Sequence, residues 1–226
     1  MCRAAIIGLF IASAASVAAE EVAVFPEACD PKLTIQAVDC TVTHYALCAF
    51  DGEAAAMQVR YDGSGLRQSQ ILDADNHPLR VFSDAIDLRF DESIRADRMS
   101  SSVLLAKGTD GYAFTLTSET APISKMTFFG SDELTAKTVI ANGFHLRELR
   151  GRYVRTTYFN GRSVTEAFEV EQYVEEEFGF FVPVRETRIG SAARKSSEQA
   201  PVDFLRPGDD GFLSVQPLYC GPGASS

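Results

Sequence analysis

The chain contains no tryptophan and only three histidines, and familiar catalytic motifs are missing from its 226 residues. It has no Gly-x-Ser-x-Gly nucleophile turn, no His-Glu-x-x-His zinc motif and no glycine-rich phosphate loop. Cys-x-x-Cys is also absent, which removes the usual signature of thiol redox catalysis. We therefore predict no catalytic residue and no cofactor, and a hydrolase without a recognisable motif is only the third choice of function.

Excess basic charge and long apolar runs are also absent. The chain has 31 acidic and 21 basic residues, a formal net charge of −10, which argues against nucleic acid or an anionic lipid surface as a partner. Beyond the N-terminus, no apolar run approaches the roughly 20 residues that a membrane-spanning helix needs. Hydrophobic residues make up 46% of the chain, which is typical of a globular protein with a sizeable core.

The N-terminus has the pattern of a secretory signal. A short basic start, residues 1–3, precedes an apolar stretch from residue 4 to about residue 15, and small residues follow at 17–19. We expect residues 1–19 to be a cleaved signal peptide and residues 20–226 to be one β-rich domain in the bacterial periplasm, with an uncleaved anchor as the alternative. The lack of any Asn-x-Ser/Thr acceptor favours this compartment over eukaryotic secretion.

An even number of cysteines remains after residue 19, which predicts two disulfides in an exported protein. They are Cys29, Cys40, Cys48 and Cys220. A strand over residues 40–50 would separate Cys40 from Cys48 by about 26 Å, which excludes a bond between them. Two pairings stay open. We favour Cys29–Cys40 with Cys48–Cys220 over Cys29–Cys48 with Cys40–Cys220, because a short helix after Asp30 would return Cys29 to Cys40.

Cys40, His44 and Cys48 recur at every fourth residue, a spacing that brings thiolates and an imidazole to one zinc ion only on a helix. The β-branched and aromatic residues between them favour a strand, in which His44 and Cys48 point to the core. We therefore predict no metal site. Three acidic segments are likewise interpreted as solvated turns and not as calcium sites: residues 73–76, 175–177 and 209–211.

Alternating apolar and polar residues, separated by turns such as Asp51-Gly52 and Asn160-Gly161, dominate the rest of the chain. Helix signals are few. We expect a short helix from Asp30 to about residue 38, another over residues 132–141, and either helix or loop over residues 93–102. The sequence predicts a mainly β protein. Its antiparallel sheet of consecutive hairpins would form a half-barrel, barrel or sandwich, with one or two short helices.

The turn at Asn160-Gly161 fixes the register of a long hairpin between residues 149–159 and 162–174. One set of facing residues is charged: Arg150 with Glu171, Arg152 with Glu169, and Arg155 with Glu166. For the next loop, residues 175–179, we prefer five residues to four, which sets Val174 opposite Phe180. Pro183 predicts that the following strand is an edge strand or carries a bulge.

The apolar face of these hairpins is rich in Phe and Tyr and has few helices to cover it, which favours a groove or cavity. We therefore predict a non-catalytic protein that binds an apolar or amphipathic ligand, lipid or lipoprotein-like, on the concave face. The alternative is an envelope structural or interaction module that uses the strand near residues 180–188. The candidate ligand-binding residues are Arg147, Arg162, Tyr153, Phe168, Phe180 and Val182. The two arginines are included because the predicted Arg–Glu pairs leave them unassigned.

Overall fold

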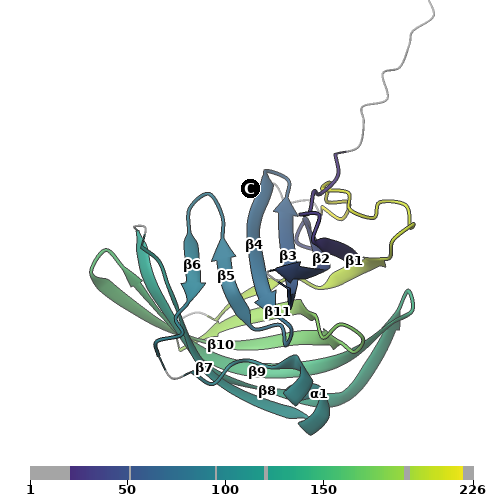
Figure 1. The fold of residues 1–226 in the computed structure, drawn as a ribbon. Coiled ribbons are helices and arrows are strands. Elements are labelled where there is room, and N and C mark those ends of the chain that lie inside the picture. The colour runs from purple at the N-terminus through teal and green to yellow at the C-terminus, as the bar shows by residue number, and fades with distance from the viewer. Residues whose placement is uncertain (1–20, 51, 95, 120–121, 191–193, 221–226) are drawn as a thin grey trace, which may run out of the picture.

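The computed structural model describes residues 21–50, 52–94, 96–119, 122–190 and 194–220 (Figure 1). The predicted signal peptide, residues 1–19, lies outside the described residues and stays a prediction. Within the described part, no helix is long and apolar enough to cross a membrane.

Thirteen strands form one antiparallel sheet, and a single short helix, α1 (Ser101–Lys107), accompanies them. The strands are β1 (Cys29–Ala37), β2 (Thr41–Phe50), β3 (Glu53–Asp62), β4 (Gly65–Asp73), β5 (Pro78–Phe82), β6 (Asp87–Phe90), β7 (Thr109–Thr117), β8 (Ile123–Ala141), β9 (Phe144–Phe159), β10 (Arg162–Glu175), β11 (Phe181–Ile189), β12 (Lys195–Glu198) and β13 (Pro201–Leu205). From β1 to β12, each strand pairs with its neighbours in the sequence, and β13 crosses over to pair with β1. The predicted sheet of consecutive hairpins is thereby confirmed.

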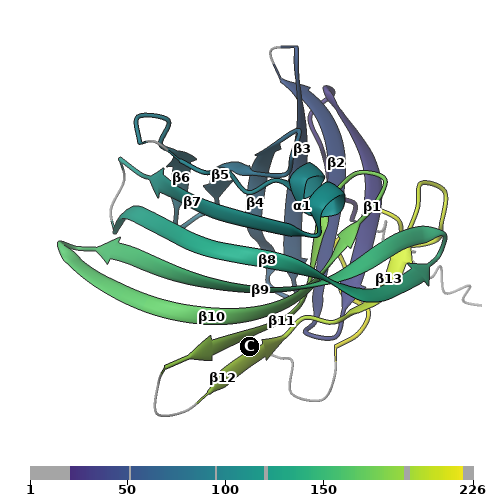
Figure 2. The same ribbon diagram turned by 90° about the horizontal axis from the view of Figure 1, so that it is seen from below.

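The sheet is strongly rolled because its two edge strands, β12 and β13, are joined by only two residues (Figure 2). Gln199 N donates a hydrogen bond to Val184 O of β11 at 2.7 Å, and Val38 N, just after β1, donates to Ala200 O at 3.0 Å. This short link therefore contacts both ends of the strand order. The architecture is a single sheet rolled around an interior, not a sandwich of two sheets.

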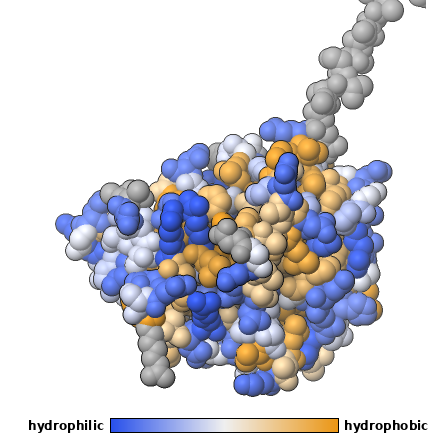
Figure 3. Space-filling model, in the orientation of Figure 1, coloured by the Kyte–Doolittle hydropathy of each residue, from blue (hydrophilic) through white to orange (hydrophobic). Residues whose placement is uncertain are grey.

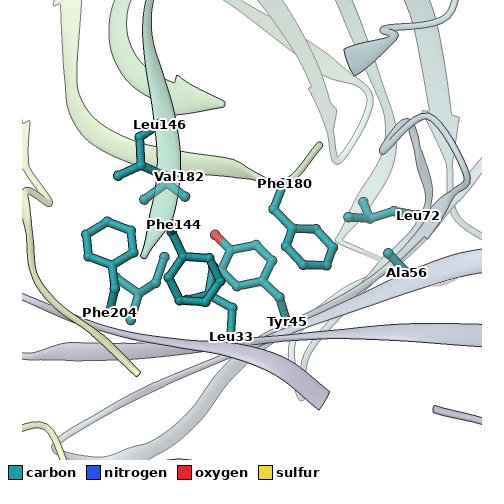
Figure 4. Close-up of a cluster of buried hydrophobic side chains, with 10 residues drawn as sticks. Leu33, Tyr45, Ala56, Leu72, Phe144, Leu146, Phe180, Val182 and Phe204 are labelled. Atoms are coloured by element: carbon teal, nitrogen blue, oxygen red, sulfur yellow. The ribbon is translucent and has the colours of Figure 1, made fainter. Parts of the chain in front are cut away.

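The largest hydrophobic cluster forms where the two ends of the strand order meet (Figure 4). Tyr45 of β2 stacks on Phe180, with ring centroids 4.9 Å apart, and the Tyr45 hydroxyl donates to Phe181 O at 2.9 Å. The other buried members are Leu33, Ile35, Ala56, Leu72, Phe144, Leu146, Val182 and Phe204. Each large side chain of this kind stabilises the fold by roughly 1.5–3 kcal/mol through burial. The cluster holds the rolled sheet together at one end.

Both faces of the first hairpin are buried. Tyr45 points to the interior, whereas His44 points to the outer face, where Thr34 lies beside it. The segment after β13 covers that outer face: Leu213 N donates to Thr34 Oγ1 at 3.1 Å, and Leu218 N donates to Gln36 Oε1 at 3.0 Å. The predicted burial of His44 and Cys48 is confirmed, but the terminal segments provide it and not the interior of the sheet.

The two helices predicted near residues 30–38 and 132–141 are wrong. The first segment belongs to β1, which pairs with β2 and β13, and the second belongs to β8, which pairs with β7 and β9. Backbone pairing on both sides outweighs the local helix-cap signals. The observed helix, α1, begins just inside the ambiguous segment 93–102. Ser100 caps it by accepting from Val103 N, and Gly108 ends it with a φ of 81°.

The disulfides are Cys29–Cys48 and Cys40–Cys220, so the pairing that we favoured is wrong and the alternative is right. The reason is the strand β1, which sets Cys29 directly opposite Cys48 in the register with β2. The exclusion of a Cys40–Cys48 bond is confirmed. Two disulfides indicate an oxidising, exported compartment.

The register predicted from Asn160-Gly161 is confirmed along the whole of β9 and β10. Two of the three charged pairs form ion pairs, Arg155–Glu166 at 2.9 Å and Arg152–Glu169 at 3.0 Å. The third pair faces across the strands as predicted, but Arg150 lies 3.7 Å from Glu148, and Glu171 pairs with Arg185 instead.

The preferred five-residue loop after β10 is wrong, because Val174 lies opposite Phe181 and not Phe180. Glu175 closes a four-residue loop: its N–H donates to Phe180 O, and its carboxylate accepts from two backbone N–H groups within the loop. The bulge expected at Pro183 is present, since Gln172 faces Pro183 while Glu171 faces Arg185. The strand is not an edge, because β12 pairs with its second half.

Two fully buried histidines are held neutral by their surroundings. Burial lowers the pKa of His44 to about 4, and its Nε2 atom has no hydrogen-bond partner among the described residues. Burial likewise lowers the pKa of His77 to about 4. The His77 ring meets Phe90 and Phe114 edge-on, with both centroids 4.7 Å away, and neither of its nitrogens has a partner in the described part of the chain.

We expect His77→Phe to raise the free energy of unfolding by about 2 kcal/mol more at pH 5 than at pH 7. In the unfolded chain His77 takes up a proton as the pH falls below 6.5, the ordinary pKa of histidine. In the folded protein His77 stays neutral until about pH 4. Stability is therefore lost as the pH falls, and the variant avoids that loss. Urea denaturation of both proteins at the two pH values measures it. If the variant and the wild-type protein differ in stability by the same amount at pH 5 and at pH 7, His77 is not held neutral by burial.

Candidate functional site

A cavity of about 220 Å³ lies inside the rolled sheet, between the strands β2–β4 on one side and β7–β11 on the other. Its lining mixes polar and apolar side chains: Tyr45, Gln58, Arg60, Gln68, Gln70, Leu72, Asn76, Pro78, Met99, Tyr112, Asp132, Tyr153, Val170, Gln172, Phe181 and Pro183. At roughly 30 Å³ for each water molecule, this volume equals about seven waters. The space is therefore suited to a small molecule.

The polar part of the lining comes from alternation along the strands, since every second residue of a strand points to the same side. Gln58 and Arg60 of β3 and Gln68 and Gln70 of β4 face inward in this way. Among the described residues, no hydrogen bond is made by the side-chain amides of Gln68, Gln70 or Gln172. These amides remain available to a ligand.

Among the described residues that line the cavity, Arg60 carries the positive charge. Its guanidinium donates to Asp39 at 2.7 Å and to Gln199 at 3.2 Å. Nearby, Gln58 Nε2 donates to the Tyr45 hydroxyl at 3.2 Å. The charge of Arg60 is thereby neutralised within the protein, and this end of the cavity is held rigidly.

Asp132 of β8 lies at the opposite side, and it is 95% buried. Its neighbour across the sheet is Gly151, where a Cβ atom would lie only 2.0 Å from Asp132 Oδ1, so the carboxyl group occupies space that any other residue would fill. In the described part of the chain Oδ1 has no hydrogen-bond partner, and no ion pair reaches the carboxylate. Burial, and then the negative charge of Asp110, raises the pKa of Asp132 to about 7.

Two tyrosines accompany Asp132. Tyr112 of β7 and Tyr153 of β9 lie on either side of Gly130, the residue two positions before Asp132 on β8. A Cβ atom at Gly130 would lie 2.7 Å from Tyr153 Cβ and 2.8 Å from Tyr112 Cε2, so glycine permits their close approach. Burial raises the pKa of both hydroxyls, and the Tyr153 hydroxyl donates to Glu186 at 2.5 Å. Both rings therefore stay uncharged beside the carboxyl group.

The structure brings only some of the predicted site residues together. Tyr153 lines the cavity and stacks on Phe168 at 4.8 Å. Phe180 and Val182 instead belong to the neighbouring hydrophobic cluster, and Phe181 and Pro183 line the cavity in their place, as the shorter loop after β10 requires.

The two predicted arginines lie apart. Arg147, near the start of β9, is 3.9 Å from Glu176, whereas Arg162 begins β10 at the far end of the same hairpin and is exposed. They do not form one anion site. Asp132 is not identifiable from the sequence, because its segment is predicted to be helical. The inward-facing glutamines are not identifiable either, because the predicted interior is apolar.

A larger recess of about 950 Å³ opens beside the Cys40–Cys220 disulfide. Its walls are hydrophilic, and its arginines are already paired, Arg60 with Asp39 and Arg67 with Asp62. Among the described residues that line this recess, none carries a buried side-chain polar atom without a partner, so the interior cavity is the better candidate site.

Of the three described histidines, His44 contacts the buried Thr34 hydroxyl at 2.8 Å, whereas His77 has no side-chain hydrogen bond within the described residues. No serine or cysteine there hydrogen-bonds to His77 or His145, and no group of three His, Cys, Asp or Glu side chains gathers as a metal site would. No family model, curated protein or solved structure matches this chain.

Proposed function

We propose that this protein is a non-catalytic binding protein that holds a small amphipathic molecule inside the rolled sheet. The observation that carries the proposal is the interior cavity, which has unpaired amides and a buried carboxyl group on a background of aromatic and aliphatic side chains. Binding sites commonly combine an apolar lining with a few convergent polar groups of this kind. A tightly packed core would leave no such space.

The volume narrows the ligand class. Sites for drug-sized ligands commonly span about 300–1,000 Å³, and this cavity, at about 220 Å³, lies below that range. It therefore fits a small amphipathic molecule and does not enclose a whole two-chain lipid. On the face seen in Figure 1, hydrophobic and hydrophilic side chains are interspersed, with hydrophobic ones gathered near the middle (Figure 3).

The proposed location is the bacterial periplasm. Two disulfides fit an oxidising compartment, and the basic and apolar pattern of residues 1–19 fits an export signal. A binding protein in this location would meet small molecules that enter the envelope.

Saturation-transfer NMR with a panel of small cationic, neutral and anionic molecules tests the proposed function. We expect at least one class to bind the wild-type protein and to lose binding in Val170→Phe, which fills the cavity beside Gly151. Val164→Phe is the matched control, because it makes the same change on the same strand at a residue that is 55% exposed. Gln172→Phe gives a second filling variant in case Val170→Phe unfolds. Binding that survives both filling variants, or no binding of any class, would overturn the proposal.

A further inference from the structure

We propose that the ligand is a small organic cation whose ammonium group pairs with Asp132 and contacts the rings of Tyr112 and Tyr153. This inference rests on the proposed function and names the ligand class for the same cavity. It goes beyond that function because the cavity also contains amides that would accept uncharged or anionic ligands.

The charge balance of the cavity favours a cation. Arg60 is neutralised by Asp39 at 2.7 Å, whereas Asp132 has no ion-pair partner among the described residues. An ionised Asp132 therefore leaves the cavity with one uncompensated negative charge. A buried carboxylate without a partner is strongly unfavourable, and a bound cation removes that penalty. An anionic ligand would increase it.

The aromatic neighbours favour an ammonium group. Tyr112 and Tyr153 flank Gly130 from the two adjacent strands, on the face of β8 from which Asp132 also points into the cavity. Aromatic faces attract cations, and paired aromatic rings with a nearby carboxylate are well suited to ammonium groups whose charge is spread over several carbons. The free amides of Gln68, Gln70 and Gln172 are left to bind a polar substituent of the ligand.

The other titratable groups that line the cavity do not change charge near neutral pH. Burial raises the pKa of Tyr45, Tyr112 and Tyr153, so their hydroxyls stay protonated, and a guanidinium such as that of Arg60 stays charged. Asp110 faces Asp132 from β7 and burial raises its pKa, but it lies outside the lining and accepts a hydrogen bond from Ser100 N at 2.7 Å. Asp132 is therefore the lining group whose ionisation controls binding. A cation binds its charged form and displaces its proton.

Three probes of one shape and different charge test the inference: choline, its uncharged carbon isostere 3,3-dimethylbutan-1-ol, and the anion 3,3-dimethylbutanoate. Calorimetric titration at pH 8 should give an affinity for choline at least tenfold above that for the uncharged isostere, and none for the anion. Asp132→Asn should abolish this preference, and the exposed control Asp84→Asn should keep it. Lowering the pH from 8 to 5 should weaken choline binding by about eightfold or more, toward the affinity of the uncharged isostere, because little Asp132 is then ionised.

The outcomes separate this inference from the proposed function. If the uncharged isostere or the anion binds as well as choline, or if choline affinity is the same at both pH values, the cation is the wrong class while the binding function stands. If none of the three binds, the inference is overturned, and the wider panel with the cavity-filling variants decides whether the binding function fails as well.

Discussion

Replacing Asp132 with asparagine should raise the free energy of unfolding by about 4 kcal/mol at pH 9 in the absence of ligand. The folded protein raises the pKa of this carboxyl group from 3.8 to about 7, so above pH 7 it must hold a buried negative charge that the unfolded chain exposes to water. The stability of the wild-type protein therefore falls as the pH rises from about 4 to 7. Asparagine has the same shape without the charge and avoids this loss.

The increase in the free energy of unfolding of Asp132→Asn over the wild-type protein should be about 3 kcal/mol smaller at pH 5 than at pH 8. At pH 5 Asp132 is protonated in the folded wild-type protein. Urea denaturation of the two proteins at both pH values measures the effect. Asp84→Asn, on the exposed turn between β5 and β6, is the matched control and should change stability by less than about 0.5 kcal/mol. A destabilised Asp132→Asn protein at pH 8 would show that the carboxylate has a partner in the free protein.

A polar group that destabilises the empty protein is typical of binding sites, where stability is exchanged for function. Asp132 fits this description because it is buried, unpaired and next to a cavity. If the stabilised Asp132→Asn variant also loses cation binding, one residue will account for both effects.

Removal of the Cys40–Cys220 disulfide should lower the free energy of unfolding by about 5 kcal/mol, more than removal of Cys29–Cys48, which should lower it by about 3 kcal/mol. The first disulfide spans 180 residues and the second spans 19, and a longer closed loop restricts the unfolded chain more. Cys40–Cys220 also holds the C-terminal segment on the outer face of β1, where Gln36 bonds to Gln216 and Leu218.

The double variants Cys40→Ala/Cys220→Ala and Cys29→Ala/Cys48→Ala serve as controls for each other. Urea denaturation gives the two free energies, and peptide mapping of the unreduced wild-type protein checks the pairing independently. Equal losses, or a larger loss for the 19-residue loop, would contradict the entropic account. A map showing Cys29 bonded to Cys40 would contradict the fold of β1.

The sequence predicted features that depend on neighbouring residues. Asn160-Gly161 fixed the register of β9 and β10 because a two-residue turn leaves one pairing, and the facing Arg155–Glu166 pair agrees with it. The sheet of consecutive hairpins followed from the two-residue periodicity of many short segments. These signals are local, and nothing distant in the chain opposes them.

Features that depend on distant contacts could not be predicted. Asp30-Pro31 is a typical helix start, yet this segment pairs as a strand with β2 and β13. Because the disulfide prediction depended on that helix, the predicted Cys29–Cys40 bond was wrong as well. The loop after β10 is shorter than predicted because the Glu175 side chain itself bonds to the loop backbone.

The site escaped sequence analysis for a related reason. The sequence predicts that His44 and Cys48 point to the core, but this face of the first hairpin is covered by the terminal segments instead. The side chains that point into the interior from this hairpin include Gln58 and Arg60 of β3. Only the rolled sheet brings these residues near Asp132, which is 72 residues beyond Arg60 in the chain.

The carbon-13 NMR titration of the Asp132 carboxyl group, with and without choline, tests the account most directly. We expect a midpoint near pH 7 in the free protein, because the group is buried without a partner. Saturating choline should lower that midpoint by at least about one pH unit, since a bound cation favours the ionised form. A midpoint near the ordinary value of 3.8 in the free protein, or one that choline leaves unchanged, would contradict the account.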